Sequence, residues 1–168
     1  DNAGDVNGDG IDDILIGAPF ADANGVDSGA AYVVYGPVDG LINLADAGAE
    51  LRGENPGDRA GWSVSTAVDV NNDGFVDVLV GATYHDAGGE SAGAAYLVLG
   101  PIAGVMTLDN AEAKITGDNP WDLMGFAVSD AGDLNADGYD DFVVGANKDD
   151  EAFVDAGTAY VVHGPVSG

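Results

Sequence analysis

Residues 69–77 read DVNNDGFVD, which places oxygen-bearing side chains at the first, third, fifth and ninth positions and a glycine at the sixth. The same pattern occurs 64 residues earlier, as DVNGDGIDD over residues 5–13, and 64 residues later, as DLNADGYDD over residues 133–141. Oxygen side chains spaced in this way around a glycine turn can surround one hard cation. The spacing therefore predicts three equivalent cation-binding loops and a repeated architecture.

Each loop offers three carboxylates, one amide and one backbone carbonyl, the last from a position where an apolar residue is tolerated. The expected ligands are Asp5, Asn7, Asp9, Asp13 and the carbonyl of Ile11; Asp69, Asn71, Asp73, Asp77 and the carbonyl of Phe75; and Asp133, Asn135, Asp137, Asp141 and the carbonyl of Tyr139. A set of oxygen ligands without His or Cys favours Ca²⁺ over zinc or copper. Mg²⁺ is disfavoured because it requires strict octahedral geometry and keeps its waters. We expect about three Ca²⁺ ions, one per loop.

Two other interpretations of the loops stay open. An EF-hand or dockerin-like module shares the first half of the pattern, but it leads into a helix and needs an acid at position 12. Here position 12 is Ile16, Val80 or Val144, each within a β-like run. The loops could also be plain solvated turns, because Asp, Asn and Gly dominate turns. The recurrence of the same pattern in all three units weighs against the interpretation as plain turns.

Each 64-residue unit contains four short runs typical of strands. In the central unit, Ser63–Val68 alternates with a period of two, and Val76–Val80 is a short β-branched run ended by glycine. Ala94–Leu99 and Ala113–Thr116 follow, the latter preceded by a brief turn at Leu108–Glu112. No strongly periodic helix is evident. Four antiparallel strands per unit, arranged radially, form a blade of a β-propeller.

The units run approximately over residues 1–60, 61–124 and 125–168, the first lacking its first strand and the third its last. Three full units would require 192 residues, against 168 in the chain. Closed propellers have about 4–8 blades. We therefore expect an incomplete propeller or a fragment, whose open blade edges can recruit partners, including further copies of the chain.

Other short motifs recur in phase with the loops. Gly61-Trp62 and Gly125-Phe126 open two units, and Gly17-Ala18-Pro19 has the counterparts Gly81-Ala82-Thr83 and Gly145-Ala146-Asn147. Together with the acidic loops, these motifs resemble the FG-GAP repeat, the blade of the integrin α-subunit propeller and of many bacterial surface proteins. The resemblance covers residues 1–168 as one segment. The resemblance implies an all-β fold of FG-GAP propeller blades. The likeness to integrin α-subunits in particular implies cell adhesion and protein partners.

The composition narrows the class of partner. The chain has 30 acidic and four basic residues, a formal charge of −26. Such a charge repels nucleic acid, and it serves either solubility or a salty, calcium-rich setting. The chain has no cysteine, and no apolar run approaches membrane-spanning length, so we expect no direct membrane insertion. Weak calcium loops with dissociation constants of roughly 10⁻⁴–10⁻³ M work outside the cell. This favours an extracellular or cell-surface location.

Few residues outside the loops suggest chemistry. There is no cysteine nucleophile and no triad spacing, so we expect no enzyme. His85 and His163 are expected to be ordinary surface or edge residues. Three aspartates recur in one connecting loop and are expected to cap a turn: Asp22, Asp86 and Asp150.

The aromatic residues have two expected roles. Those that recur in phase should pack between blades: Tyr32, Tyr96, Tyr160, Trp62 and Phe126. Trp121 stands where the preceding unit has Gly57, so it is the candidate for a surface contact. The loops that differ most between units, residues 20–28, 84–92 and 148–156, are where binding specificity is expected.

The sequence thus predicts a calcium-binding, non-enzymatic structural or adhesion module of a secreted or cell-surface protein, with a protein or glycan ligand. Two alternatives remain: a carbohydrate-binding, lectin-like propeller, and a non-catalytic part of a secreted hydrolase or lyase.

Overall fold

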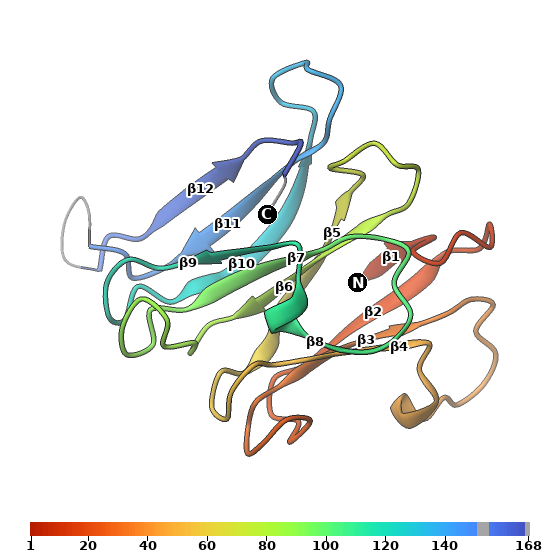
Figure 1. The fold of residues 1–168 in the computed structure, drawn as a ribbon, viewed down its shortest axis with the longest axis horizontal. Coiled ribbons are helices and arrows are strands. Elements are labelled where there is room, and N and C mark those ends of the chain that lie inside the picture. Colours follow the sequence, from red (N-terminus) through yellow and green to blue (C-terminus); the bar gives the residue numbers. More distant parts are fainter. Residues whose placement is uncertain (151–154, 167–168) are drawn as a thin grey trace.

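The computed structural model describes residues 1–150 and 155–166 of the chain (Figure 1). Within these residues, the fold is all-β, and two short 3₁₀ helices are the only helical elements. The strands form three sheets that stand side by side and are not closed into a ring. None of the described helices is long and apolar enough to cross a membrane.

The second blade contains the four antiparallel strands that the sequence predicts. Its order is β5-β6-β7-β9, with bounds β5 Ala60–Val68, β6 Asp77–Ala82, β7 Ala94–Val98 and β9 Ala113–Thr116. The short runs form strands because their β-branched side chains suit a pleated, buried surface. Gly81 does not end its run as expected, because β6 continues through Gly81 to Ala82 and both residues pair with β5 and β7, whereas Gly93 directly precedes β7.

The first blade repeats this plan with a short first strand, and the described part of the third blade has three strands. The first unit has four strands, the first of which is only three residues long: β1 Asn2–Gly4, β2 Asp13–Ala18, β3 Ala30–Val34 and β4 Ala49–Arg52. In the described part of the third unit, three strands form an antiparallel sheet: β10 Met124–Gly132, β11 Asp141–Ala146 and β12 Thr158–Val162.

One strand was not expected from the sequence. β8 (Gly104–Thr107) belongs to the second unit but pairs in parallel with β4 of the first, so that Gly104 lies opposite Ala49. Figure 1 shows this segment crossing toward β3 and β4. The first sheet therefore gains a fifth strand, which ties the two blades together at their outer edge. The 3₁₀ helix η2 (Leu108–Asn110) follows β8 within the expected turn, and η1 (Leu44–Asp46) has the same place in the first unit.

Two apolar cores fill the spaces between blades. Val78 and Val80 of β6 pack toward the first blade, in a core that also contains Leu15 and Val33. Leu79, between them, packs toward the third blade with its neighbour Phe142. Alternate residues of a strand face opposite sides of the sheet, so β6 is buried on both faces. Blade stacking is thus the main source of burial, and it fixes where the acidic loops lie.

Candidate calcium loops

The three acidic loops occupy equivalent places in the three blades. Each joins the first strand of a blade to the second: residues 5–13 link β1 to β2, residues 69–77 link β5 to β6, and residues 133–141 link β10 to β11. None leads into a helix, because each runs directly into a strand. This excludes the EF-hand-like alternative.

In the second loop, the first, third and fifth side chains gather around the turn. Asp69 Oδ1 accepts the N–H of Asp73 at 3.0 Å, and Asp69 Oδ2 accepts the N–H of Gly74 at 2.9 Å. Asn71 Oδ1 also accepts the N–H of Asp73, and Asp73 Oδ1 accepts the N–H of Phe75. The turn requires a glycine because Gly74 has a φ of 91°.

The same bonds recur in the other two loops. In the first, Asp5 accepts the N–H groups of Asp9 and Gly10, and Asn7 accepts that of Asp9. In the third, the Asp133 carboxylate accepts from Asp137 and Gly138. Backbone N–H groups thus hold three of the oxygen side chains of each loop in one arrangement.

The ninth aspartate differs from the other three side chains in its burial and in the backbone groups that it binds. Asp77 is fully buried, its Oδ2 accepts the N–H of Val70, and its Oδ1 accepts the N–H of Gly100 just after β7, both at 2.9 Å. Asp13 and Asp141 make the equivalent bonds with Gly36 and Gly164. This aspartate fastens each loop to the end of the third strand.

The local environment separates the carboxyl pKa values. The N–H groups around Asp5, chiefly that of Gly10, lower its pKa, so this carboxylate stays ionised. Burial raises the pKa of Asp13, and it raises that of Asp77 to about 6. Burial would also raise the pKa of Asp141, but the His163 imidazole, 3.0 Å away, and two backbone N–H groups lower it overall.

The donor chemistry of the loops suits Ca²⁺, although carboxylates alone do not make the site. In the described part of the chain, no three His, Cys, Asp or Glu side chains converge closely enough to hold a metal by themselves. A cation here would also need the amide oxygen of Asn7, Asn71 or Asn135 and a backbone carbonyl. Both are donors that Ca²⁺ accepts. The fifteen ligands therefore stay a prediction.

The loops also contact one another across blades. A Cβ built at Gly8 of the first loop would lie 2.7 Å from Cε1 of Phe75 in the second. Asp140 Oδ2 of the third loop accepts the N–H of Asp69 at 3.4 Å. This contact could not be predicted from the sequence, because Asp140 stands at a loop position that varies between units. A change that holds one loop in place should therefore also constrain the neighbouring loop, through the Gly8–Phe75 and Asp69–Asp140 contacts.

The expectation that His85 is a surface or edge residue is wrong. His85 is only 3% exposed, and its Nε2 lies 3.2 Å from Glu54 Oε2 of the first blade. Its loop folds back into the seam between the first two blades, where its ring meets Tyr96 edge-on. His163 is exposed as expected, although it contacts Asp141.

Other expectations about single residues are confirmed. The side chains of Asp22, Asp86 and Asp150 each accept a backbone N–H five residues further on, as turn caps do. Trp62 contacts Phe126 of the third blade, with ring centroids 6.2 Å apart, and Tyr96 is buried between blades. Trp121 is 49% exposed, but whether it contacts a partner stays a prediction.

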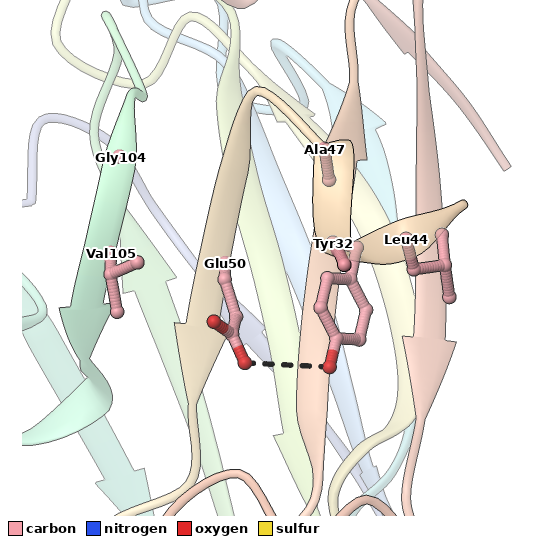
Figure 2. Close-up of a pocket in the computed structure, with 7 residues that line it drawn as sticks. Tyr32, Leu44, Ala47, Glu50, Gly104 and Val105 are labelled. Atoms are coloured by element: carbon pink, nitrogen blue, oxygen red, sulfur yellow. Dashed lines mark hydrogen bonds between the residues drawn. The ribbon is translucent and has the colours of Figure 1, made fainter. Parts of the chain in front are cut away.

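A cavity of about 380 Å³ opens on the outer part of the first blade and contains none of the predicted ligands (Figure 2). Tyr32, Leu44, Glu50 and Val105 line it, with Val105 coming from β8 of the second unit. The Tyr32 hydroxyl donates to Glu50 Oε1 at 3.4 Å, and Arg52 pairs with Glu50 Oε2 at 2.8 Å. The polar groups in this cavity thus satisfy one another.

Comparison with known proteins agrees with this geometry. The FG-GAP repeat family matches residues 2–34 and 60–98, which include the first two acidic loops. The chain is 35% identical to integrin alpha pat-2 of Caenorhabditis elegans over 98% of its length, and 34% identical to integrin alpha-PS2 of Drosophila melanogaster over 89%. It is also 34% identical to human integrin alpha-6 over 69% of its length.

The chain spans only 14%, 11% and 10% of these three relatives, respectively. The relatives named here are all integrin alpha subunits, and none of their names denotes an enzyme. The blades, the repeated loops and the sequence identity together show that the chain is an FG-GAP repeat protein related to integrin alpha subunits.

Proposed function

We propose that this chain is a calcium-stabilised, non-enzymatic adhesion module of a cell-surface or secreted protein. One Ca²⁺ ion binds in each acidic loop and holds the loop and its neighbouring blade in a fixed arrangement. In the second loop, Asp69, Asn71, Asp73 and Asp77 would hold the ion with the carbonyl of Phe75, and the equivalent residues would do so in the other two. The ion supplies charge neutralisation and rigidity, with no role in a reaction.

The observation that carries this proposal is the identical bonding of the three loops. In each, the first aspartate accepts the N–H of the fifth residue and that of the glycine, as Asp5, Asp69 and Asp133 do. These bonds orient oxygens toward one turn and leave carboxylates of like charge close together. A divalent cation relieves that repulsion.

Metal binding should therefore favour the folded chain. A ligand that binds only the folded state at 100 times its dissociation constant stabilises it by about 2.7 kcal/mol per site. Because Phe75 and Asp140 join neighbouring loops, part of this stabilisation should reach the packing between blades.

The names of the relatives support the proposed location and partners. Integrin alpha subunits are similar to this chain over most of its length, so we infer a cell-surface setting and a protein ligand. We also infer three blade units, at approximately 1–60, 61–124 and 125–168, within a larger propeller whose open edges pair with further blades or further copies of the chain. The variable loops at residues 20–28, 84–92 and 148–156 would distinguish one ligand from another.

Calorimetry and thermal unfolding test the calcium role. The metal-free chain, titrated with CaCl₂, should bind about three ions, and its melting temperature should rise with calcium and fall when EDTA is added. MgCl₂ at the same concentration is the control and should give a much smaller rise. An unchanged melting temperature in millimolar calcium would mean that the loops are solvated turns.

A row of aromatic rings favours carbohydrate binding as a second candidate function. Trp62 contacts Phe20, Tyr84 and Phe126, with centroids 5.7–6.5 Å apart. Phe20 is 60% exposed and Phe126 39%, which leaves ring surface on which a sugar can stack. A glycan array tests this candidate. Glycan binding that Phe20→Ala abolishes would support carbohydrate binding. An array without signal would rule it out and leave the adhesion module as the remaining candidate function.

A further inference from the structure

His85 is enclosed between the first two blades, and both of its ring nitrogens have a partner. Its ring meets that of Tyr96 edge-on, with centroids 6.2 Å apart. Nε2 lies 3.2 Å from Glu54 Oε2 of the first blade, and Nδ1 lies 3.1 Å from the backbone nitrogen of Ala87. The imidazole therefore connects the neighbouring blade, on one side, with the turn that follows it in the chain, on the other.

The bond with Ala87 determines the protonation state of the ring. A backbone N–H can only donate, so Nδ1 must be an unprotonated acceptor, and the proton of the neutral ring lies on Nε2 and points to Glu54. An imidazolium carries a proton on both nitrogens. It can keep the bond to Glu54, but its Nδ1–H would face the N–H of Ala87. Protonation of His85 and the bond from Ala87 therefore exclude each other.

The carboxylates beside the ring supply counter-ions for an imidazolium. Nε2 of His85 lies 3.2 Å from Glu54 and 3.9 Å from Asp58 Oδ2, and a buried charge is tolerated where it is paired in this way. The other charged or titratable side chains around this part of the seam are Lys114, which binds Glu54; Arg59, which lies over the ring of Tyr84; Tyr96; Asp86; and Asp109, which lines a cavity together with Glu54. Two carboxylates thus approach the ring, whereas Lys114 is already paired with Glu54.

The bond from Ala87 belongs to the first turn of its variable loop. The carbonyl of Asp86 accepts the N–H of Gly89 at 3.1 Å, which places Ala87 at the second position of a β-turn. Further along the loop, the carbonyl of Glu90 accepts the N–H of Trp121 at 2.9 Å. The loop thus extends from the seam between the blades to an exposed tryptophan, and a change in its first turn can reach both.

The blade itself does not need an imidazole at this position. The equivalents of His85 in the other two units are Ala21 and Asp149. In the first unit, the loop keeps its cap without an imidazole, because the carboxylate of Asp22 still accepts the N–H of Asp27 at 2.9 Å. His85 therefore gives the second variable loop a titratable group that the same loop of the first unit lacks.

We propose that His85 is a pH-sensitive switch for the variable loop at residues 84–92. The neutral ring accepts the N–H of Ala87 and holds the first turn of the loop against the seam. When the pH falls through the range in which histidines ordinarily titrate, roughly pH 8 to 5, protonation breaks this bond and frees the turn, while the imidazolium stays paired with Glu54 and Asp58. The base of the loop remains attached, because the carbonyl of His85 accepts the N–H of Gly93 at 2.9 Å in either state. The switch is independent of the calcium role and of the identity of the ligand.

NMR of the full ¹⁵N-labelled chain tests the proposal. The ring nitrogens of His85 are followed from about pH 8 to about pH 5 in saturating calcium, and amide hydrogen exchange is measured at both ends of this range. Each exchange rate is corrected for the intrinsic rate at its pH. We expect Nδ1 of His85 to gain a proton and the protection of the Ala87 and Ser91 amides to fall by about tenfold or more, while Val80, within β6, keeps its protection. A ring that stays neutral to about pH 5, or a protonated ring with Ala87 still protected, would overturn the proposal.

Ala87→Pro is the matched variant, because proline suits the second position of a β-turn and removes only the N–H that the neutral ring accepts. His85 should still titrate in this variant, but the protection of Ser91 should no longer depend on pH. An unchanged pH dependence of Ser91 would refute the switch.

His85→Gln tests the same point from the other side of the bond. It keeps a donor for Glu54 but does not titrate, so the loop should exchange alike at both ends of the pH range. His163→Gln removes the second of the two histidines of the chain and should leave the pH dependence of the loop intact. A pH dependence that survives in His85→Gln and disappears in His163→Gln would assign it to the other histidine and overturn the proposal.

Discussion

Lys114 Nζ lies 2.8 Å from Glu54 Oε1, so the last strand of the second blade is bound to the segment that leaves the last strand of the first. His85 approaches the other oxygen of Glu54 at 3.2 Å. Because His85 Nδ1 accepts the N–H of Ala87, its Nε2 is the nitrogen that donates to Glu54. Two donors of one blade therefore meet a single carboxylate of its neighbour.

Glu54→Gln should lower the free energy of unfolding by about 1–3 kcal/mol, the usual range for hydrogen bonds to a charged group. The amide keeps the shape of the side chain but loses the charge and one acceptor. Urea unfolding followed by tryptophan fluorescence measures the change. Glu90→Gln, in an exposed loop, is the control and should change stability by less than about 0.5 kcal/mol. Equal stability of the two variants would show that the contact contributes nothing.

The contribution of Glu54 should also depend on pH. Burial favours the neutral acid, but the hydrogen bonds from Lys114 and His85 outweigh it and lower the pKa of Glu54 below its usual value. A carboxyl group with a lowered folded-state pKa stabilises the fold above its unfolded-state pKa, and that stability is lost as the pH falls through the folded-state value. The stability difference between the wild type and Glu54→Gln should thus be largest above about pH 5 and shrink toward pH 3. A difference that grows on acidification would contradict this assignment.

The sequence predicted what local patterns encode. Short β-branched runs ended by glycine indicated β6 and β7, and the recurrence of Asp69 and its equivalents indicated three identical loops. It could not predict β8, because Gly104–Thr107 is half-exposed and gains its partner, β4, from another blade. The contact of Glu54 with Lys114 joins residues 60 positions apart that belong to no motif. The burial of His85 could not be predicted for the same reason, since it depends on a loop that folds between the first two blades.

Gly17→Ala should destabilise the chain by about 1–3 kcal/mol or more, the range for overfilling a packed interface. Its new Cβ would lie 2.1 Å from the carbonyl oxygen of Gly61, and backbone cannot yield as a flexible side chain can. Thermal unfolding of the purified variant measures the loss. Gly145→Ala, the same substitution at the equivalent open position, should leave the melting temperature within a degree or two. Equal effects of both would mean that a property of the strand, rather than blade contact, requires glycine.

Asp73→Asn tests whether the loops bind calcium through individual carboxylates. The amide oxygen can still accept the N–H of Phe75, although the bond from Asn71 Nδ2 to the second oxygen of Asp73 is lost, and the cation loses one charged ligand. We expect one of three calcium sites to weaken at least tenfold, about 1.4 kcal/mol, in isothermal titration calorimetry. Asp12→Asn removes the same charge from an exposed loop position outside the ligand pattern and should leave all three sites intact. If both variants weakened binding equally, the total charge of the chain, rather than the loop ligands, would account for calcium affinity, because a general electrostatic effect does not distinguish position five from position eight.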